Sequence, residues 1–269
     1  MSEQALIDKN AGNMMSAASL RLQLSDLGIK HGDCVFAHTS LSQIGWLPNG
    51  AQLMAEILVE AVGDTGLICV PTFTGQNTDP ANWSRPPVPH AWHAEIRNSM
   101  PAFQPEFTPS RMMGAINEVL RTMPEAYRGT HPRSSFAAIG AGAFEVVNEY
   151  TLEAEFDDCS ALGKLYQKNA KVLFLGTDFA NCTCFHLAEH RVGGLRSLPG
   201  GSAMIVDGKR RWVDFAGDDY CDDDFEILGA DFASVSKTMK TGKIGRADSK
   251  LFSMREAVDF AQNWMDKSR

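Results

Sequence analysis

Apolar runs of strand length alternate with amphipathic stretches over the first third of the chain. Leucines recur at helical spacing over residues 16–29, and the pattern ends at Gly28. The apolar run 34–38 then predicts a buried strand, residues 50–62 predict a helix, and residues 67–73 predict a second buried strand. A strand, a helix and a strand in this order predict a βαβ unit, whose sheet is covered by helices on both faces.

The same alternation continues after residue 110. Further strands are predicted at 135–140, 171–176, 202–206 and 210–216. Further helices are predicted at 111–123, 142–149, 160–169, 183–191, 223–233 and 254–266. Ser110 is expected to cap the first of these helices. Because we find no internal repeat and no linker, we predict a single α/β domain over residues 1–269, with a mixed β-sheet and helices on both faces.

Residues 74–109 interrupt this alternation. They contain seven of the twelve prolines, together with Trp83 and Trp92. A segment of this length without predicted elements commonly forms a lid or the wall of a binding site. The alternative is a structural excursion that is packed by its own aromatic side chains.

The composition narrows the function classes. The chain has 25 Lys and Arg against 33 Asp and Glu, which gives a formal net charge of −8, and 44% of its residues are hydrophobic. Such a composition is typical of a globular protein and argues against a disordered or fibrous chain. The acidic balance argues against nucleic-acid binding, which needs a basic surface, and suits a cationic small molecule.

The sequence also predicts a cellular location. No apolar run approaches the roughly 20 residues that span a bilayer, so we expect no membrane association. Residues 1–15 lack a basic start followed by an apolar stretch, so we expect no export signal. The six cysteines are few and scattered, which favours reduced thiols in a cytoplasmic protein.

The richest chemistry lies in residues 176–191, directly after a predicted strand. His186, Glu189 and His190 share one helix face at spacing i, i+3, i+4. One interpretation is the H-x-x-E-H zinc signature, in which both histidines bind the metal and the glutamate is the base. The alternative is an ordinary polar helix start. Cys182 and Cys184 raise a third hypothesis, a Cys–His acyl-enzyme, although small buried cysteines are more common.

Two further stretches are candidates for binding. Residues 214–226 contain six aspartates, which repel one another unless a cation lies among them, although three of them also suit a helix N-terminus. Residues 37–46 follow the first strand with small hydroxyl side chains and a glycine, which let main-chain N–H groups approach a ligand.

Successive blocks of the chain resemble the aminoglycoside 3-N-acetyltransferase family. In order, these blocks are HTSLSQIGWLPNGAQ, LICVPTFTGQNTDPANW, PPVPHAWHAEIRNSMPAFQPEFTPSRMMG, RGTHPRSSFAAIG and NCTCFHLAEHR, followed by DDYCDDDF and LFSMREAVDFAQNWM. The resemblance covers nearly the whole chain. It implies transfer of acetyl from acetyl-CoA to the 3-amino group of a 2-deoxystreptamine aminoglycoside, with no metal.

The resemblance also implies residue roles. The family pattern N-x-T-x-x-H-x-A-E makes His186 the catalytic histidine, and the N/D-D-H/Y-C pattern makes Asp219 its acidic partner; Glu189 is a third catalytic candidate. The implied coenzyme-binding residues are His38, Thr39, Ser40, Leu41, Ser42, Thr72, Ser110, Arg111, Met112, His131, Ser134, Ser135 and Phe136. The implied substrate-binding residues are Asp79, Trp92, Phe103, Asp178 and Asp218.

The chemistry of acetyl transfer fits these roles. An ammonium group must lose a proton before it attacks a thioester, and a histidine is suited to take that proton. A carboxylate on the other ring nitrogen would fix the tautomer. We expect main-chain N–H groups of residues 38–42 to face the thioester carbonyl. Direct transfer in a ternary complex is thus our main hypothesis. The alternatives are a zinc hydrolase and a non-catalytic protein that binds a cationic small molecule.

Overall fold

The computed structural model describes residues 7–8, 14–148, 151–153 and 155–269. Most of residues 1–15 and residue 149 of the predicted helix 142–149 lie outside the described residues. In the described ranges no helix is long and apolar enough to cross a membrane. The cysteines in these ranges are free thiols. The cytoplasmic location stays a prediction.

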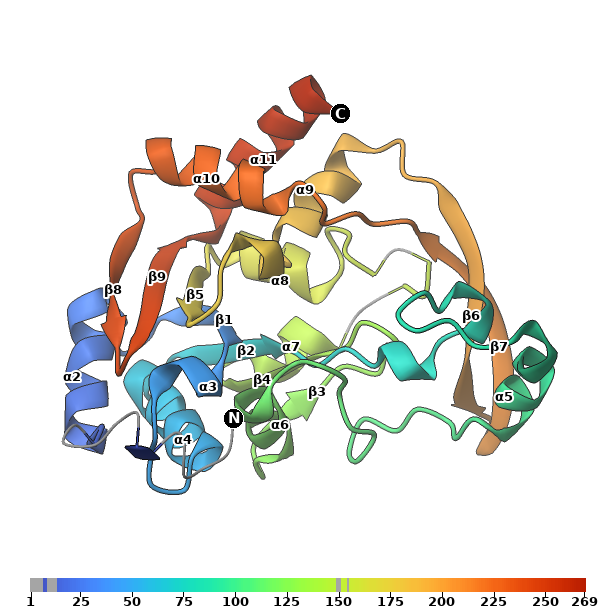
Figure 1. Cartoon of the computed structure of the whole chain (residues 1–269), viewed down its shortest axis with the longest axis horizontal. Coiled ribbons are helices and arrows are strands. Elements are labelled where there is room, and N and C mark those ends of the chain that lie inside the picture. Colours follow the sequence, from blue (N-terminus) through green and yellow to red (C-terminus); the bar gives the residue numbers. More distant parts are fainter. Residues whose placement is uncertain (1–6, 9–13, 149–150, 154) are drawn as a thin grey trace.

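A seven-stranded sheet forms the centre of the molecule (Figure 1). Its strands, in spatial order, are β3 (Tyr127–Arg128), β4 (Phe136–Gly140), β2 (Leu67–Pro71), β1 (Cys34–Thr39), β5 (Lys171–Leu175), β9 (Ala247–Ser253) and β8 (Lys240–Ile244). Strand β1 runs parallel to β2 and β5, whereas β4 and β9 are antiparallel to their inner neighbours. The predicted βαβ unit and the mixed sheet are therefore confirmed.

Helices cover both faces of this sheet because successive side chains of each strand point to opposite sides. In β1, Val35 and Ala37 pack with one group of helices, and Phe36 packs with the other. The first group is α2 (Ala17–Leu27), α4 (Ala51–Val62) and α6 (Ala115–Thr122). The second is α7 (Ala143–Val147), α8 (Ala161–Gln167), α9 (Phe185–Val192), α10 (Phe225–Val235) and α11 (Met254–Ser268). The predicted α/β fold, with helices on both faces, is confirmed.

Strands β8 and β9 are a feature that the sequence pattern does not predict. Residues 240–253 contain four lysine or arginine side chains and no continuous apolar run, so a search for buried apolar strands misses them. In the structure β9 pairs with β5 along the whole length of β5, and Leu251 and Phe252 pack on opposite faces of the sheet. The charged residues Asp248 and Lys250 alternate with the buried residues Ala247, Ser249 and Leu251.

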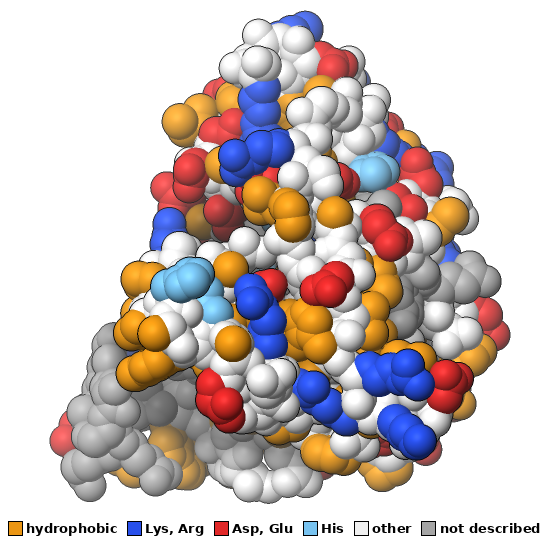
Figure 2. Space-filling model, turned by 90° about the vertical axis from the view of Figure 1, so that its right-hand side faces the viewer, with side chains coloured by type: hydrophobic (Ala, Val, Ile, Leu, Met, Phe, Trp, Pro, Cys, Tyr) orange, Lys and Arg blue, Asp and Glu red, His pale blue; other side chains and the backbone are white. Residues whose placement is uncertain are grey.

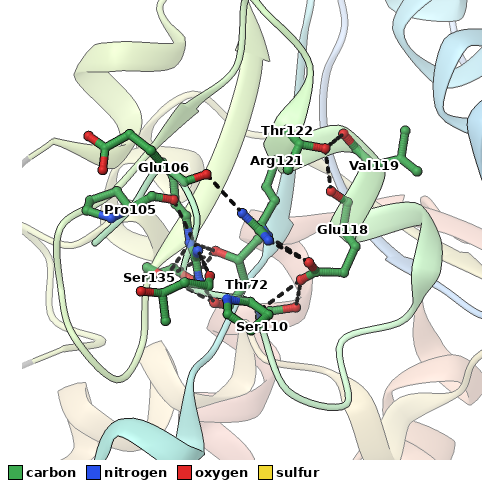
Figure 3. A network of polar contacts seen from close by, with 12 residues as sticks. Thr72, Pro105, Glu106, Ser110, Glu118, Val119, Arg121, Thr122 and Ser135 are labelled. Atoms are coloured by element: carbon green, nitrogen blue, oxygen red, sulfur yellow. Dashed lines mark hydrogen bonds and ion pairs between the residues drawn. The ribbon is translucent and has the colours of Figure 1, made fainter. Parts of the chain in front are cut away.

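The helix predicted at 111–123 is shorter than expected. It begins at Ala115, because Met112 and Gly114 both have positive φ angles, which interrupt a right-handed helix. Ser110 therefore caps no helix. Its N–H donates to Glu118 Oε1, and its hydroxyl bonds the same oxygen (Figure 3).

A separate two-stranded ribbon, β6 (Ser197–Val206) and β7 (Lys209–Asp218), stands away from the main sheet (Figure 1). The predicted strands 202–206 and 210–216 thus exist, but they do not join the main sheet. Basic and acidic side chains are interspersed over this side of the molecule (Figure 2). The ribbon positions Asp218, at the end of β7, beside helix α9, where its carboxylate contacts His190.

The proline-rich segment 74–109 packs along this ribbon. It forms short helices rather than one open loop: η1 (Gly75–Asn77), η2 (Pro80–Asn82), η3 (His90–Trp92) and α5 (His93–Ser99). The Ser202 hydroxyl donates to the Asn77 carbonyl, and the Phe103 N–H donates to the Ala203 carbonyl. Both are contacts between the segment and β6. Segment and ribbon together build one wall of the cavity described below.

Candidate active site

His186 lies at the start of α9, directly after the loop that follows strand β5. The turn η4 (Phe179–Asn181) and Cys182 lead the chain from the sheet edge into this helix. The His186 side chain is 16% exposed and lines a cavity of about 590 Å³. His186 thus lies beyond the carboxyl end of a strand, which is where α/β folds usually bind their ligands.

Glu189 is the carboxylate that holds His186. Its Oε2 lies 2.9 Å from His186 Nδ1, one helical turn away. Its Oε1 accepts hydrogen bonds from the Cys221 N–H at 2.9 Å and from Arg269 Nη1 at 2.6 Å. Burial disfavours the charged form of this side chain, which is 3% exposed, yet these hydrogen bonds together keep the pKa of Glu189 below its usual value. An ionised carboxylate only accepts, so His186 Nδ1 is the donor in this hydrogen bond.

Asp219 does not have the position predicted for it. Its carboxylate accepts from Arg196 at 2.6 Å, and its side chain is 36% exposed. Its own N–H donates to the Arg196 carbonyl, so this residue extends the pairing of the ribbon beyond β7. That pairing directs the side chain to Arg196, and Glu189 occupies the position on His186 that the sequence assigned to Asp219.

Aromatic side chains fix the plane of the His186 ring. Phe156 stacks on it with an interplanar angle of 10° and 5.1 Å between ring centroids. Tyr220 and Phe225 contact it at centroid distances of 5.3 and 4.9 Å. Phe156 is missing from the sequence prediction because it lies in a polar stretch with no strand or helix pattern. With Nδ1 bonded to Glu189, these contacts leave the ring little freedom to rotate.

The cavity beside His186 has an acidic lining. Five of its lining residues are carboxylates, and they come from three separate segments: Asp79, Glu155, and the stretch with Asp218, Asp219 and Asp222. Arg133 is the cationic residue among the described lining residues, and it is paired with Glu155. Glu155 was not singled out from the sequence. A cationic ligand would therefore meet an attractive field in this cavity.

A second hollow, of about 630 Å³, adjoins the first, and five residues line both: Thr39, Met112, Met113, Thr177 and Asn181. Ser40, Leu41 and Ser42 line only the second one, at the short helix α3 (Leu41–Ile44). The Ser40 N–H does not face it, because this group donates to the Leu175 carbonyl and extends the β1–β5 pairing. We expected main-chain N–H groups of residues 38–42 to face the coenzyme, and for Ser40 this expectation is wrong.

His38 is a buried side chain in the wall of the first cavity. Its ring lies edge-on to Phe36 and Phe174, and its Nε2 has no hydrogen-bond partner among the residues that the structure describes. Burial lowers the pKa of His38 to about 3, so the ring is neutral at physiological pH. A neutral ring with an unused polar atom is a place where a ligand group could bond.

The other predicted coenzyme residues divide into two groups. Ser134 lines the first cavity, and Met112 lines both. The remainder, which line neither cavity, are Thr72, Ser110, Arg111, His131, Ser135 and Phe136. Several of them support the walls. Thr72 and Ser135 bond each other, and His131 Nδ1 accepts from the Ser134 N–H.

The predicted substrate residues are also split. Asp79 and Asp218 line the first cavity, where Asp79 is paired with Arg97. Trp92 is 58% exposed on the proline-rich segment, and Phe103 is buried under Arg128. Asp178 caps η4 and pairs with Lys250. None of these last three lines the cavity, so their predicted contact with substrate has no support in this geometry.

His190 faces a different set of partners from His186. Its Nδ1 lies 3.3 Å from Asp218 Oδ2 and 3.4 Å from the Tyr220 hydroxyl. The two histidines of the H-x-x-E-H pattern thus bond separate carboxylates. In the part of the chain that the structure describes, no group of three or more His, Cys, Asp or Glu side chains is arranged to hold a metal ion.

Comparison with known proteins places this chain in a family. Residues 36–266 match the family described as aminoglycoside 3-N-acetyltransferase. The SPbeta prophage-derived aminoglycoside N(3')-acetyltransferase-like protein YokD of Bacillus subtilis is 41% identical over 91% of this chain and 90% of its own. Aminoglycoside N(3)-acetyltransferase IX of Micromonospora chalcea is 30% identical over 99% of this chain and 98% of its own.

Solved structures agree with the sequence comparison. The crystal structure of YokD superimposes with a TM-score of 0.94 at 38% identity, over 98% of this chain and 97% of YokD. AAC-VIa bound to sisomicin gives 0.85 at 30% identity, over 96% of this chain and 99% of the other. AAC-IIIb in a binary complex with CoASH gives 0.84 at 25% identity, over 95% and 98%.

Proposed function

The chain belongs to the aminoglycoside 3-N-acetyltransferase family, and on that premise we propose that it transfers acetyl from acetyl-CoA to the 3-amino group of a 2-deoxystreptamine aminoglycoside. The observation that carries this proposal is the buried His186–Glu189 pair, which opens onto an acidic cavity. The relatives solved with CoASH and with sisomicin support the two substrate classes. Membership of the family makes acetyl transfer the expected reaction.

His186 is the proposed general base. Because Nδ1 is bonded to Glu189, Nε2 is the ring nitrogen left to take a proton from the acceptor ammonium. The amine then attacks the thioester carbonyl, a C–N bond forms, and the C–S bond breaks. The nitrogen loses a second proton as the amide forms. One of the two protons ends on the CoA sulfur, and the other passes from His186 to the solvent, so that the products are the amide, free CoA thiol and one released proton. Glu189 stabilises the imidazolium that forms in between.

The acceptor would lie in the first cavity. Asp218 and Asp222 line this cavity close to Tyr220, which contacts His186. Carboxylates at these positions would bind the ammonium groups that a polycationic antibiotic carries besides the reacting one. The acidic lining and the net charge of −8 favour such a ligand.

The coenzyme would enter through the second hollow. Ser40, Leu41 and Ser42 line it, and Thr39 and Met112 lead from it into the first cavity. An extended thiol-bearing arm fits this pair of connected hollows, since its thioester would arrive near His186. The buried Nε2 of His38 is an unused polar atom along this route.

A coupled assay tests the function directly. The purified protein is mixed with acetyl-CoA and a panel of aminoglycosides, and release of free CoA thiol is followed with a colorimetric disulfide reagent. We expect thiol release that depends on the antibiotic, and a product heavier by one acetyl group in mass spectrometry. Tight binding of aminoglycosides without thiol release would instead support the non-catalytic alternative.

Direct transfer also predicts that the neighbouring cysteines are dispensable. Cys182 and Cys184 are fully buried, with 3.4 Å between their sulfur atoms. Burial raises the pKa of Cys182 well above its ordinary value, which disfavours the thiolate that an acyl-enzyme needs. We therefore expect Cys182→Ala and Cys184→Ala to keep kcat within a few-fold. Loss of turnover in one well-folded variant, together with an acetylated cysteine in the parent protein, would favour an acyl-enzyme.

A further inference from the structure

Arg269, the residue that follows α11, lies behind the proposed catalytic pair. Its Nη1 donates to Glu189 Oε1 at 2.6 Å, on the oxygen that does not face His186. Its Nη2 donates to Asp224 Oδ1 at 2.6 Å and to the Cys221 carbonyl at 3.0 Å, and its Nε donates to Asp224 Oδ2 at 2.9 Å. One guanidinium thus joins α9, the loop after β7 and the start of α10, at the end where α11 packs beside α9 (Figure 1).

We propose that Arg269 is a positioning residue for the His186–Glu189 pair: it holds Glu189 in place and limits how strongly this carboxylate favours the protonated imidazole. The inference deepens the proposed function and rests on His186 being its base. Glu189 accepts three hydrogen bonds, from His186, Cys221 and Arg269, so its charge is shared between one ring and one cation. A planar, permanently charged fork is suited to this sharing.

Arg269 is well placed to keep its charge. Its hydrogen bond to Asp224, opposed by burial and reinforced by the bond to Glu189, raises the pKa of Arg269 above its ordinary value. Two effects on His186 then have the same sign. The guanidinium neutralises part of the Glu189 charge, and it repels a second positive charge on the imidazole. Without Arg269, the imidazolium would be more stable, so a larger fraction of His186 would be protonated at a given pH.

Other polar and charged groups lie around the His186–Glu189 pair, and a substitution of Arg269 does not change them. Tyr220 contacts the His186 ring, and Asp218 and Asp222 line the same cavity from the segment after β7. Arg133 and Glu155 pair with each other on the facing segments. Among the hydrogen bonds of the described residues, none of these groups donates to Glu189. Substitution of Arg269 therefore removes the positive charge next to this carboxylate and leaves these groups in place.

The test compares Arg269→Gln with the parent protein and with Arg255→Gln. Arg255 lies on the same helix and donates to the carbonyls of Tyr166 and Gln167, remote from the pair. The first readout is an NMR titration of the His186 ring in the free protein, which needs no turnover. We expect the midpoint of His186 protonation to move to higher pH by about 0.5–1 unit in Arg269→Gln and to stay in place in Arg255→Gln.

The second readout is the pH profile of kcat/KM for acetyl transfer. In Arg269→Gln its acidic limb should shift by the same amount, so that activity falls several-fold near pH 6 and approaches the parent value near pH 9. Arg269→Lys keeps the positive charge but not the planar guanidinium. In this variant the acidic limb should return at least half of the way to its position in the parent protein. The melting temperatures of all variants show whether each is folded.

Two results would overturn the proposal. One is an unchanged His186 midpoint in a folded Arg269→Gln protein. The other is a loss of kcat/KM by one common factor at every pH, which is the result expected of a purely structural contact. If the parent protein transfers no acetyl group to any aminoglycoside, the proposed function fails, and the NMR titration alone still decides whether Arg269 controls His186.

Discussion

His186→Ala is expected to lower kcat for acetyl transfer by about 10²–10⁴, the usual contribution of a positioned general base. The physical reason is that the acceptor enters the site as an ammonium, which cannot attack a thioester until it loses a proton. Binding of CoA should be nearly unchanged, because the ring acts on the acceptor amine. Steady-state kinetics and calorimetric titration with CoA measure the two quantities separately.

His190→Ala is the matched comparison for this variant. His190 lies one turn further along α9 and bonds Asp218 and Tyr220 rather than Glu189. We expect its loss to reduce kcat far less than the loss of His186. Two results together would instead favour the metal hydrolase. Both variants would lose activity equally and severely, and the parent protein would lose its activity on chelation and regain it when Zn²⁺ is added. Turnover of His186→Ala near the parent value would remove His186 from the role of base.

Glu189→Gln should have the second largest effect, a fall in kcat of about 10²–10⁴ with little change in KM for acetyl-CoA. Glu189 accepts three hydrogen bonds on two oxygens, whereas an amide offers one acceptor oxygen and one donor group. If the amide turns its NH2 group to His186, it bonds the wrong tautomer of the ring. If it turns its oxygen to His186, both Arg269 and the Cys221 N–H lose the acceptor that they share. We therefore also expect a loss of about 1–3 kcal/mol in the free energy of unfolding.

Asp219→Asn separates the two candidate carboxylates. Asp219 pairs with Arg196 at the surface, so its amide variant should keep kcat and stability close to those of the parent. Chemical denaturation and kinetics on both variants give the comparison. If Asp219→Asn lost activity as steeply as Glu189→Gln, Asp219 would have to reach His186 during turnover, and its pairing with Arg196 would belong to the resting protein only.

Much of the fold is readable from local sequence patterns. Strands β1, β2 and β5 are short apolar runs, and a buried parallel strand needs apolar side chains on both faces. Strand β9 is different. It lies second from the edge of the sheet with Asp248 and Lys250 among its residues, and it is a strand because it pairs with β5 and β8. Local pattern cannot report a pairing that depends on a distant segment.

The proposed catalytic histidine was equally accessible from the sequence, because the block around His186 resembles a family motif. Its spacing to Glu189 also places both side chains on one helix face, which is a local property of any helix. The choice between Glu189 and Asp219 was not local. It depends on the ribbon β6–β7, whose pairing continues to Asp219 and brings that carboxylate to Arg196.

The sequence by itself thus determined the class of fold, the family resemblance and the histidine, since each is written in residues that are close together along the chain. The tertiary structure decided which carboxylate holds that histidine, which acidic residues share its cavity, and that Arg269 lies behind Glu189. These contacts join residues that are up to 80 positions apart. Their geometry follows from the packing of α9, α10 and α11 against one another, which no short stretch of sequence specifies.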